Sequence, residues 1–266
     1  MAKKLHIDNW IARAEPDYYT MFIKAWIPFN AWYVDKYPQL YQNDSKIIRE
    51  LVSSKNEIKA FIKSLLSDTD EDYTRFCYHL SQLHIELEKK KLQHRSEDIS
   101  FTSIFFGEFT CDPVDDIDEE GINYQASQPT KLQNFFQALI VKEKKTYLSV
   151  KMSTYDLATL LTHEEFVGLP KKEMKEIIKK CFVRIDPMQK VDVTTSSLVP
   201  GEFLLIDDNE KTRFKNDKEL IAKSLIKILY YLRCLLFHGE INPSDHNTIV
   251  YEHSFQVLKY IVQKIK

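Results

Sequence analysis

The 266-residue sequence contains little glycine, only 5 residues, against an average share of about 7% in globular proteins. Neither GxGxxG nor a P-loop ending in GKS or GKT occurs, which excludes both glycine-rich phosphate-binding loops. The four cysteines are widely spaced and form no CxxC pair, a pattern typical of reduced structural thiols rather than a zinc or disulfide framework. No apolar run reaches about 18 residues, so we predict no transmembrane helix.

The charge balance is close to neutral, with 37 Lys and Arg against 39 Asp and Glu. A net charge of −2 creates no long-range field for a polyanion, so any contact with nucleic acid must come from a local patch. Hydrophobic residues make up 44% of the chain, which excludes wholesale disorder. The first residues lack the apolar core of a signal peptide, and we therefore expect a cytoplasmic protein.

An aromatic stripe near the N-terminus predicts an amphipathic helix that begins at about residue 17. Apolar and aromatic residues recur there at steps of three and four, so they share one helical face. Pro28 lacks an amide proton, and we expect a kink or break near it. Asn30 is an amide among aromatic neighbours and needs hydrogen-bond partners if it is buried. The members of the stripe are Tyr19, Phe22, Ile23, Trp26, Ile27, Asn30 and Tyr33.

Periodicity predicts further helices on both sides of an irregular middle third. Residues 45–92 are expected to form two or three helices, and a final helix opens at Ser244 or Asp245. A helix over 218–237 is apolar on nearly every side, which indicates a central, buried element. Between these regions we predict strands at 99–106 and 146–150 and helices at 155–166 and 170–182.

The segment 231–240 contains the most informative motif, YLRCLLFHGE. Arg233 and His238 stand at the end of the apolar helix, which Gly239 is expected to stop. A buried guanidinium needs an anion or several acceptors to offset its desolvation. Five helical steps place the two side chains about 140° apart, so they converge in one cleft only if two copies of the helix meet across a twofold axis.

Here the sequence resembles the HEPN superfamily, whose signature is Arg-x4–6-His at the end of a late helix. Arg233 and His238 fit this signature with four intervening residues, and the Leu-Phe-His-Gly ending fits a prokaryotic branch. The segment Trp26–Tyr33 is similar to the first helix of such proteins. The resemblance covers residues 10–92 and 215–265. It implies a mainly α fold, a HEPN-type helical bundle formed by residues 1–95 and 215–266, with an irregular α+β insert of unknown role at 96–214.

The resemblance also implies a homodimeric, metal-independent endoribonuclease that acts as a toxin or antiviral defence effector, without a cofactor. His238 would act as general acid or base, and Arg233 would hold the scissile phosphate. An antitoxin or another protein of a defence system would be a further partner, and no membrane contact is implied. Supporting residues of the site would be Asn30, Tyr33 and Glu240.

Two other interpretations remain open. Many active members carry a polar residue directly after the arginine or one place later, where this chain has Cys234 and Leu235. A non-catalytic HEPN-like adaptor that binds RNA, a nucleotide or a partner protein is therefore the alternative, and a helical interaction protein without groove chemistry is the third. If RNA binds, we expect it on the basic run Lys89–Arg95 and on the basic helix 170–182, the latter through Lys171, Lys172, Lys175 and Lys179.

Overall fold

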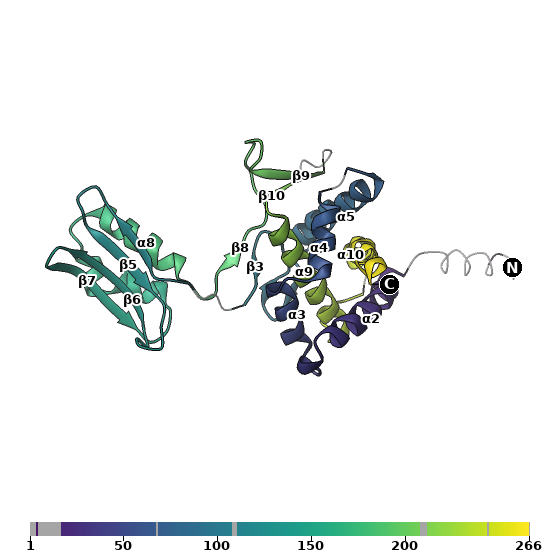
Figure 1. Cartoon of the computed structure of the whole chain (residues 1–266), viewed down its shortest axis with the longest axis horizontal. Helices are drawn as coiled ribbons and strands as arrows, with labels where there is room; N and C mark the ends of the chain where they lie inside the picture. Colours follow the sequence, from purple (N-terminus) through teal and green to yellow (C-terminus); the bar gives the residue numbers. More distant parts are fainter. Residues whose placement is uncertain are drawn as a thin grey trace. The chain divides into compact units, whose positions relative to one another are not determined.

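The structure is a computed structural model, and it describes Lys4 and residues 17–67, 69–107, 111–207, 212–243 and 245–265. The chain divides into two compact units (Figure 1). The helical unit comprises Met1–Phe106 and Lys190–Lys266, and the sheet unit comprises Gly107–Gln189. Residues 1–3 and 5–16, at the start of the predicted bundle segment, lie outside the described residues.

The helices of the helical unit begin where short polar side chains cap them. In front of α2, α3, α4, α5 and α9, an Asp or Asn side chain accepts a hydrogen bond from the backbone N–H three residues later, which satisfies a donor that the helix itself leaves free. The predicted helix over 218–237 is confirmed as α9. The bounds are α2 (Tyr18–Lys36), η1 (Pro38–Leu40), α3 (Asp44–Ser53), α4 (Glu57–Leu65), α5 (Glu71–Lys90), α9 (Lys218–Phe237) and α10 (Asp245–Lys264).

Helix α9 lies at the centre of the helical unit and packs against α2, α3 and α4. Helix α10 packs against α2 and α5 on the other side of the core. Phe22, Trp26 and Tyr33 of the aromatic stripe are buried in this core, where Trp26 packs edge-to-face against Phe29 at 5.1 Å between ring centroids. Ile27, predicted on the same face, is 59% exposed, and Phe29 is buried instead. The apolar periodicity read from the sequence therefore predicts the core-facing surface of α9, and that of α2 except at Ile27.

Helix α2 continues through Pro28, so of the kink or break predicted there, the break is wrong. Pro28 lies on the exposed side of the helix, where water can bond the carbonyl that the missing amide would have served. The buried side of the helix keeps its hydrogen bonds.

Three two-stranded antiparallel sheets belong to the helical unit. Strand β1 (Gln93–His94) pairs with β2 (Glu97–Asp98), and the two turn residues between them, Arg95 and Ser96, both have positive φ, as a two-residue hairpin turn requires. Strand β3 (Ile104–Phe105) pairs with β8 (Lys190–Val191), and β9 (Phe203–Asp207) pairs with β10 (Thr212–Lys215). The strand predicted over 99–106 is thus reduced to β3.

The sheet unit is an antiparallel meander in the order β4-β5-β6-β7. Buried and partly exposed residues alternate along β5 and β6, as expected for a sheet covered on one face. Helix α8 packs on β4, β5 and β6, and α7 packs on β7 (Figure 1). The bounds are β4 (Val114–Ile117), β5 (Asn123–Ser127), β6 (Phe136–Lys142), β7 (Lys145–Met152), α6 (Leu157–Thr162), α7 (Glu164–Val167) and α8 (Lys172–Arg184).

The predicted fold class, a mainly α bundle with an irregular insert, is wrong. Of the described residues, 52% are helical and 18% lie in strands of four small antiparallel sheets, which is an α+β mixture. The error arises in the middle third, where short alternating segments such as 136–142 are ambiguous by themselves. They become regular strands because each pairs with a sequence neighbour and buries one face against α8.

The observed boundaries of the sheet unit, Gly107 and Gln189, lie inside the predicted insert 96–214. The flanking residues join the helical unit because β3 pairs with β8 and β9 packs on α5. Among the described residues, no helix is long and apolar enough to cross a membrane.

Candidate functional site

The Arg-x4-His motif lies at the C-terminal end of α9, where the chain makes a tight turn. Gly239 has φ +64°, the left-handed conformation that favours glycine. Its N–H donates to the carbonyl of Leu236 at 3.3 Å, and the N–H of Glu240 donates to the carbonyl of Leu235 at 2.9 Å. This pair of bonds is a Schellman motif. It ends the helix and leaves the side chains of His238 and Glu240 exposed.

Arg233 faces the N-terminus of α3. Its Nη2 lies 3.0 Å from Oδ2 of Asp44, and its guanidinium carbon lies 4.3 Å from the ring centroid of Phe237. The Arg233 side chain is 17% exposed and that of Asp44 is 29% exposed. Nε of Arg233 is buried without a hydrogen-bond partner among the described residues. The guanidinium is therefore held by a carboxylate and an aromatic face.

Two of the predicted supporting residues lie on the Arg233 side of α9. Nδ2 of Asn30 donates a hydrogen bond to the hydroxyl of Tyr33. The pKa of Tyr33 is raised to about 12, chiefly by burial. The Asp44 carboxylate acts in the same direction, whereas the hydrogen bond with Asn30 and the charge of Arg233 act against it. We call Asn30, Tyr33, Asp44, Arg233 and Phe237 the arginine cluster.

His238 belongs to a different group of side chains. Its ring is nearly parallel to that of His94, with 13° between the planes and 6.3 Å between the centroids. Nδ1 of His94 lies 2.8 Å from Oε2 of Glu240. His94 is only 6% exposed, whereas His238 is exposed. We call His94, His238 and Glu240 the histidine cluster.

The β1–β2 hairpin brings His94 to the end of α9, since β1 packs on that helix. The ring of His94 also contacts Tyr231, at 5.5 Å between centroids. Nζ of Lys227 lies 5.1 Å from the centroid of the Tyr231 ring, and burial lowers the pKa of Lys227. A cation and a phenol thus lie on the α9 surface that leads to the histidine cluster.

The sequence did not single out His94, which stands in the basic run 89–95. No motif spacing joins it to His238, because their contact is made only when the hairpin folds onto α9. The predicted site residues therefore separate into two clusters, as their angular offset along α9 requires. Glu240 joins His238 through His94, while Asn30 and Tyr33 join Arg233.

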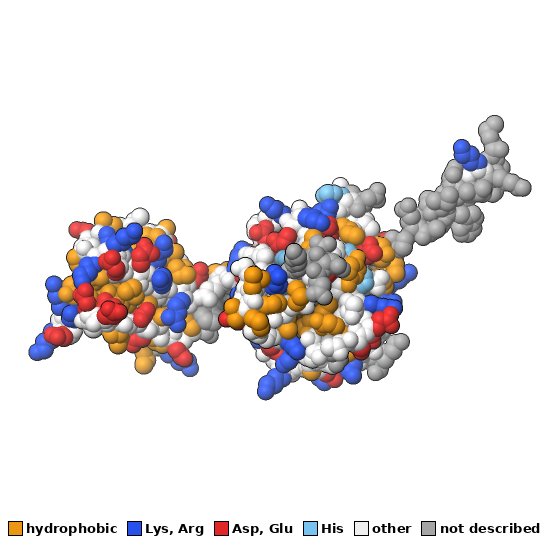
Figure 2. Space-filling model, turned by 90° about the horizontal axis from the view of Figure 1, so that it is seen from above, with side chains coloured by type: hydrophobic (Ala, Val, Ile, Leu, Met, Phe, Trp, Pro, Cys, Tyr) orange, Lys and Arg blue, Asp and Glu red, His pale blue; other side chains and the backbone are white. Residues whose placement is uncertain are grey.

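The lysines predicted to contact RNA lie in or next to α8 of the sheet unit. Lys171 forms an ion pair with Glu120, and Nζ of Lys175 donates to the carbonyl of Val167 at 2.7 Å. Helix α8 also carries Glu173 and Glu176. On the face shown in Figure 2, basic and acidic side chains are interspersed over both units. The α8 lysines are thus part of a mixed surface.

No group of three or more His, Cys, Asp or Glu side chains among the described residues is arranged to hold a metal ion. Comparisons of the chain with models of protein families, with curated proteins and with solved structures found no match.

Proposed function

We propose that the protein is an endoribonuclease that works without a metal ion and uses the histidine cluster as its catalytic site. The observation that carries the proposal is the pairing of an exposed imidazole, His238, with a second imidazole, His94, whose other side is held by Glu240. Cleavage of RNA by its own 2′-hydroxyl needs one group to accept a proton and another to donate one. Two adjacent imidazoles can supply both transfers.

The orientation of His94 follows from its partner. An ionised carboxylate can only accept hydrogen bonds, so Nδ1 of His94 carries the proton and donates it to Glu240. Nε2 then has a free lone pair and can act as the general base. In this assignment, Glu240 is a positioning residue that acts through His94.

The reaction balances with these two groups. His94 takes the proton of the 2′-hydroxyl as the O2′–P bond forms, and the P–O5′ bond breaks. His238 gives a proton to the leaving 5′ oxygen. The products are a 2′,3′-cyclic phosphate and a 5′-hydroxyl end, and no oxidant or reductant is needed.

Arg233 supports this reaction only if a phosphate replaces Asp44, or if a second copy contributes the guanidinium. Phe237 is 51% exposed at the end of α9, beside the exposed His238, which offers a surface for a second α9. We therefore include the homodimer in the proposal. A toxin or defence role, with a neutralising partner, is the biological setting that the motif resemblance suggests.

The ion pair between Arg233 and Asp44 favours a second candidate, a protein that binds RNA without cutting it. An arginine already bonded to a carboxylate and stacked on a ring has the features of a structural link. In that case Lys227 and Tyr231 would contact the phosphate and base of a bound strand.

The test is incubation of the purified chain with total RNA in EDTA, followed by analysis of the new ends. The proposal expects 2′,3′-cyclic phosphate and 5′-hydroxyl ends from wild type. It expects loss of cleavage in His238→Ala and unchanged cleavage in His246→Ala, which alters an exposed histidine on α10. Binding without cleavage in wild type would support the second candidate, and neither binding nor cleavage would refute both.

Mixing Arg233→Ala with His238→Ala protein tests the homodimer. If each site takes its arginine from one copy and its histidine from the other, mixed dimers regain one intact site, and about a quarter of the wild-type activity returns. If each copy carries its own site, the mixture shows no more activity than the average of the two variants measured separately.

A further inference from the structure

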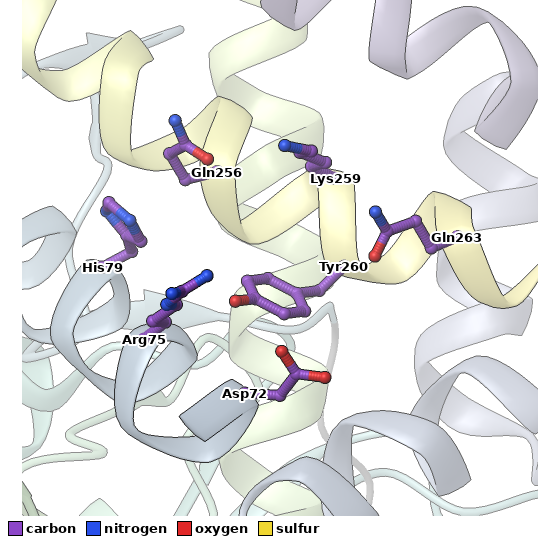
Figure 3. A pocket seen from close by; sticks show the side chains of 7 residues that line it. All are labelled: Asp72, Arg75, His79, Gln256, Lys259, Tyr260 and Gln263. Carbon is purple, nitrogen blue, oxygen red and sulfur yellow. The ribbon is translucent and has the colours of Figure 1, made fainter. Parts of the chain in front are cut away.

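A polar pocket lies in the helical unit, between α5 and α10 (Figure 3). Its volume is about 320 Å³. Every side chain that lines it has a hydrogen-bonding or charged group, so the pocket differs from an ordinary packing defect, which is apolar. The lining residues are Asp72, Arg75 and His79 of α5 and Gln256, Lys259, Tyr260 and Gln263 of α10.

The two helices present these groups in a definite order. Residues three, four and seven apart lie on one helical face, and the seven steps from Gln256 to Gln263 span about 10.5 Å. Arg75 and Lys259 lie in the middle of the pocket in Figure 3. His79 and Gln256 lie at one end, and Asp72 and Gln263 lie at the other. Cations thus stand between two sets of hydrogen-bonding groups.

Two cations, Arg75 and Lys259, line the pocket together with one carboxylate, Asp72. Arg75 forms an ion pair with Glu71, one helical turn earlier on α5, and Glu71 is not among the residues that line the pocket. Within the part of the chain that the structure describes, Lys259 has no carboxylate at ion-pair distance. A guanidinium and an ammonium that line the same pocket match an oxyanion such as phosphate.

A buried partner holds the imidazole at one end of the pocket. Nδ1 of His79 lies 3.0 Å from Nδ1 of His253, and His253 is 4% exposed. Burial lowers the pKa of both rings, to about 4 for His253. The neutral pair shares one Nδ1 proton, which leaves Nε2 of His79 as an uncharged hydrogen-bonding group for the pocket.

We propose that this pocket binds a phosphorylated sugar, free or as part of a nucleotide. The phosphate lies between Arg75 and Lys259. The sugar hydroxyls bond the carboxylate of Asp72 and the amide of Gln263, groups that accept from and donate to hydroxyls. This site is formed by elements other than the end of α9, so it is independent of the proposed ribonuclease activity.

Calorimetric titration of the full chain with ribose 5-phosphate, AMP, ribose and inorganic phosphate tests the proposal. We expect saturable binding of ribose 5-phosphate, with ribose and inorganic phosphate each at least about ten-fold weaker, because each makes only part of the contacts. AMP that binds more tightly than ribose 5-phosphate would identify a nucleotide as the source, and equal affinity would identify the sugar phosphate itself.

Substitutions then locate the binding. Arg75→Gln and Lys259→Gln should each lower the affinity about ten-fold or more. Both side chains are exposed, so the fold is not at risk. Lys144→Gln, at an exposed position of the β6–β7 turn, is the matched control and should change nothing. Asp72→Asn should weaken ribose 5-phosphate more than inorganic phosphate.

Absence of binding, or binding that neither Arg75→Gln nor Lys259→Gln weakens, would overturn the proposal. Equal affinity for inorganic phosphate and ribose 5-phosphate would overturn the sugar contacts. RNA cleavage measured in the same preparations reports on the histidine cluster separately.

Discussion

The helical unit contains two pairs of neighbouring histidines that differ in what surrounds them. His94 and His238 stack at 6.3 Å between centroids, with Glu240 bonded to the first and the second exposed. His79 and His253 bond each other through Nδ1 at 3.0 Å, and His253 is buried. The first pair has a bonded carboxylate and an exposed ring, whereas in the second pair the two rings bond each other and one of them is buried.

This difference decides what each pair can do. A carboxylate fixes the tautomer and ring orientation of His94, which suits proton transfer. The buried pair has no directly bonded carboxylate among the described residues, and burial lowers both of its pKa values. It therefore stays neutral, links α5 to α10 and positions the ring that faces the pocket. Proximity of two imidazoles is thus by itself no sign of catalysis.

The largest expected effect is the loss of RNA cleavage in His238→Ala. Removal of a general acid lowers kcat by about 10² to 10⁴-fold, while the thermal midpoint should hardly change because the side chain is exposed. Single-turnover cleavage and a thermal melt measure the two. Unchanged cleavage in this variant would show that the exposed pair is as inert as the buried one.

Glu240→Gln should have a smaller effect, a drop of about 10 to 100-fold in kcat with little change in KM, because the orientation of His94 is lost while RNA binding remains. Glu240→Asp should recover part of the rate. A change confined to KM would mean that Glu240 contacts RNA and does not act through His94.

The arginine cluster gives an intermediate effect on stability. Arg233→Ala leaves the partly buried Asp44 carboxylate without its partner, and we expect a loss of about 1 to 3 kcal/mol in the free energy of unfolding. Urea unfolding of both single variants and of Arg233→Ala with Asp44→Ala measures the coupling. A double variant no less stable than Arg233→Ala would confirm a structural ion pair, and additive losses would contradict it.

The smallest effect is a stability change with pH from the buried pair. The pKa of His253 is lowered in the fold from 6.5 to about 4, so between these values the unfolded chain binds more protons. The contribution of His253 to the free energy of unfolding is therefore fully present above pH 6.5, and it is lost as the pH drops toward 4. From pH 7 to 5 we expect a loss of about 1 to 2 kcal/mol from this group.

Denaturant unfolding of wild type and His253→Leu at both pH values isolates that contribution. The groups that face His253 are His79, Tyr78 and Glu86. His84 is partly buried and its pKa is also lowered, and it contributes its own pH dependence of stability to both proteins. An equal pH slope in the two proteins would show that His253 titrates normally in the fold.

Long periodic segments were predictable from the sequence, and contacts between distant segments were not. The apolar run of α9 with its stop at Gly239 predicted both ends of the helix. In the sheet unit the predicted strand 146–150 is confirmed as part of β7. The other strands gave no comparable signal, because a strand of four to eight residues acquires its conformation from its neighbour. His94 escaped notice for the same reason: it meets His238 only through the β1–β2 hairpin.

The local sequence by itself determined where α2, α5 and α9 begin, since capping side chains and apolar periodicity act within a few residues. It also determined that Arg233 and His238 leave α9 on different sides. Only the tertiary structure decided what each would meet, Asp44 for the guanidinium and His94 for the imidazole. Those partners lie far away in the chain, and burial of the shared core holds them in place.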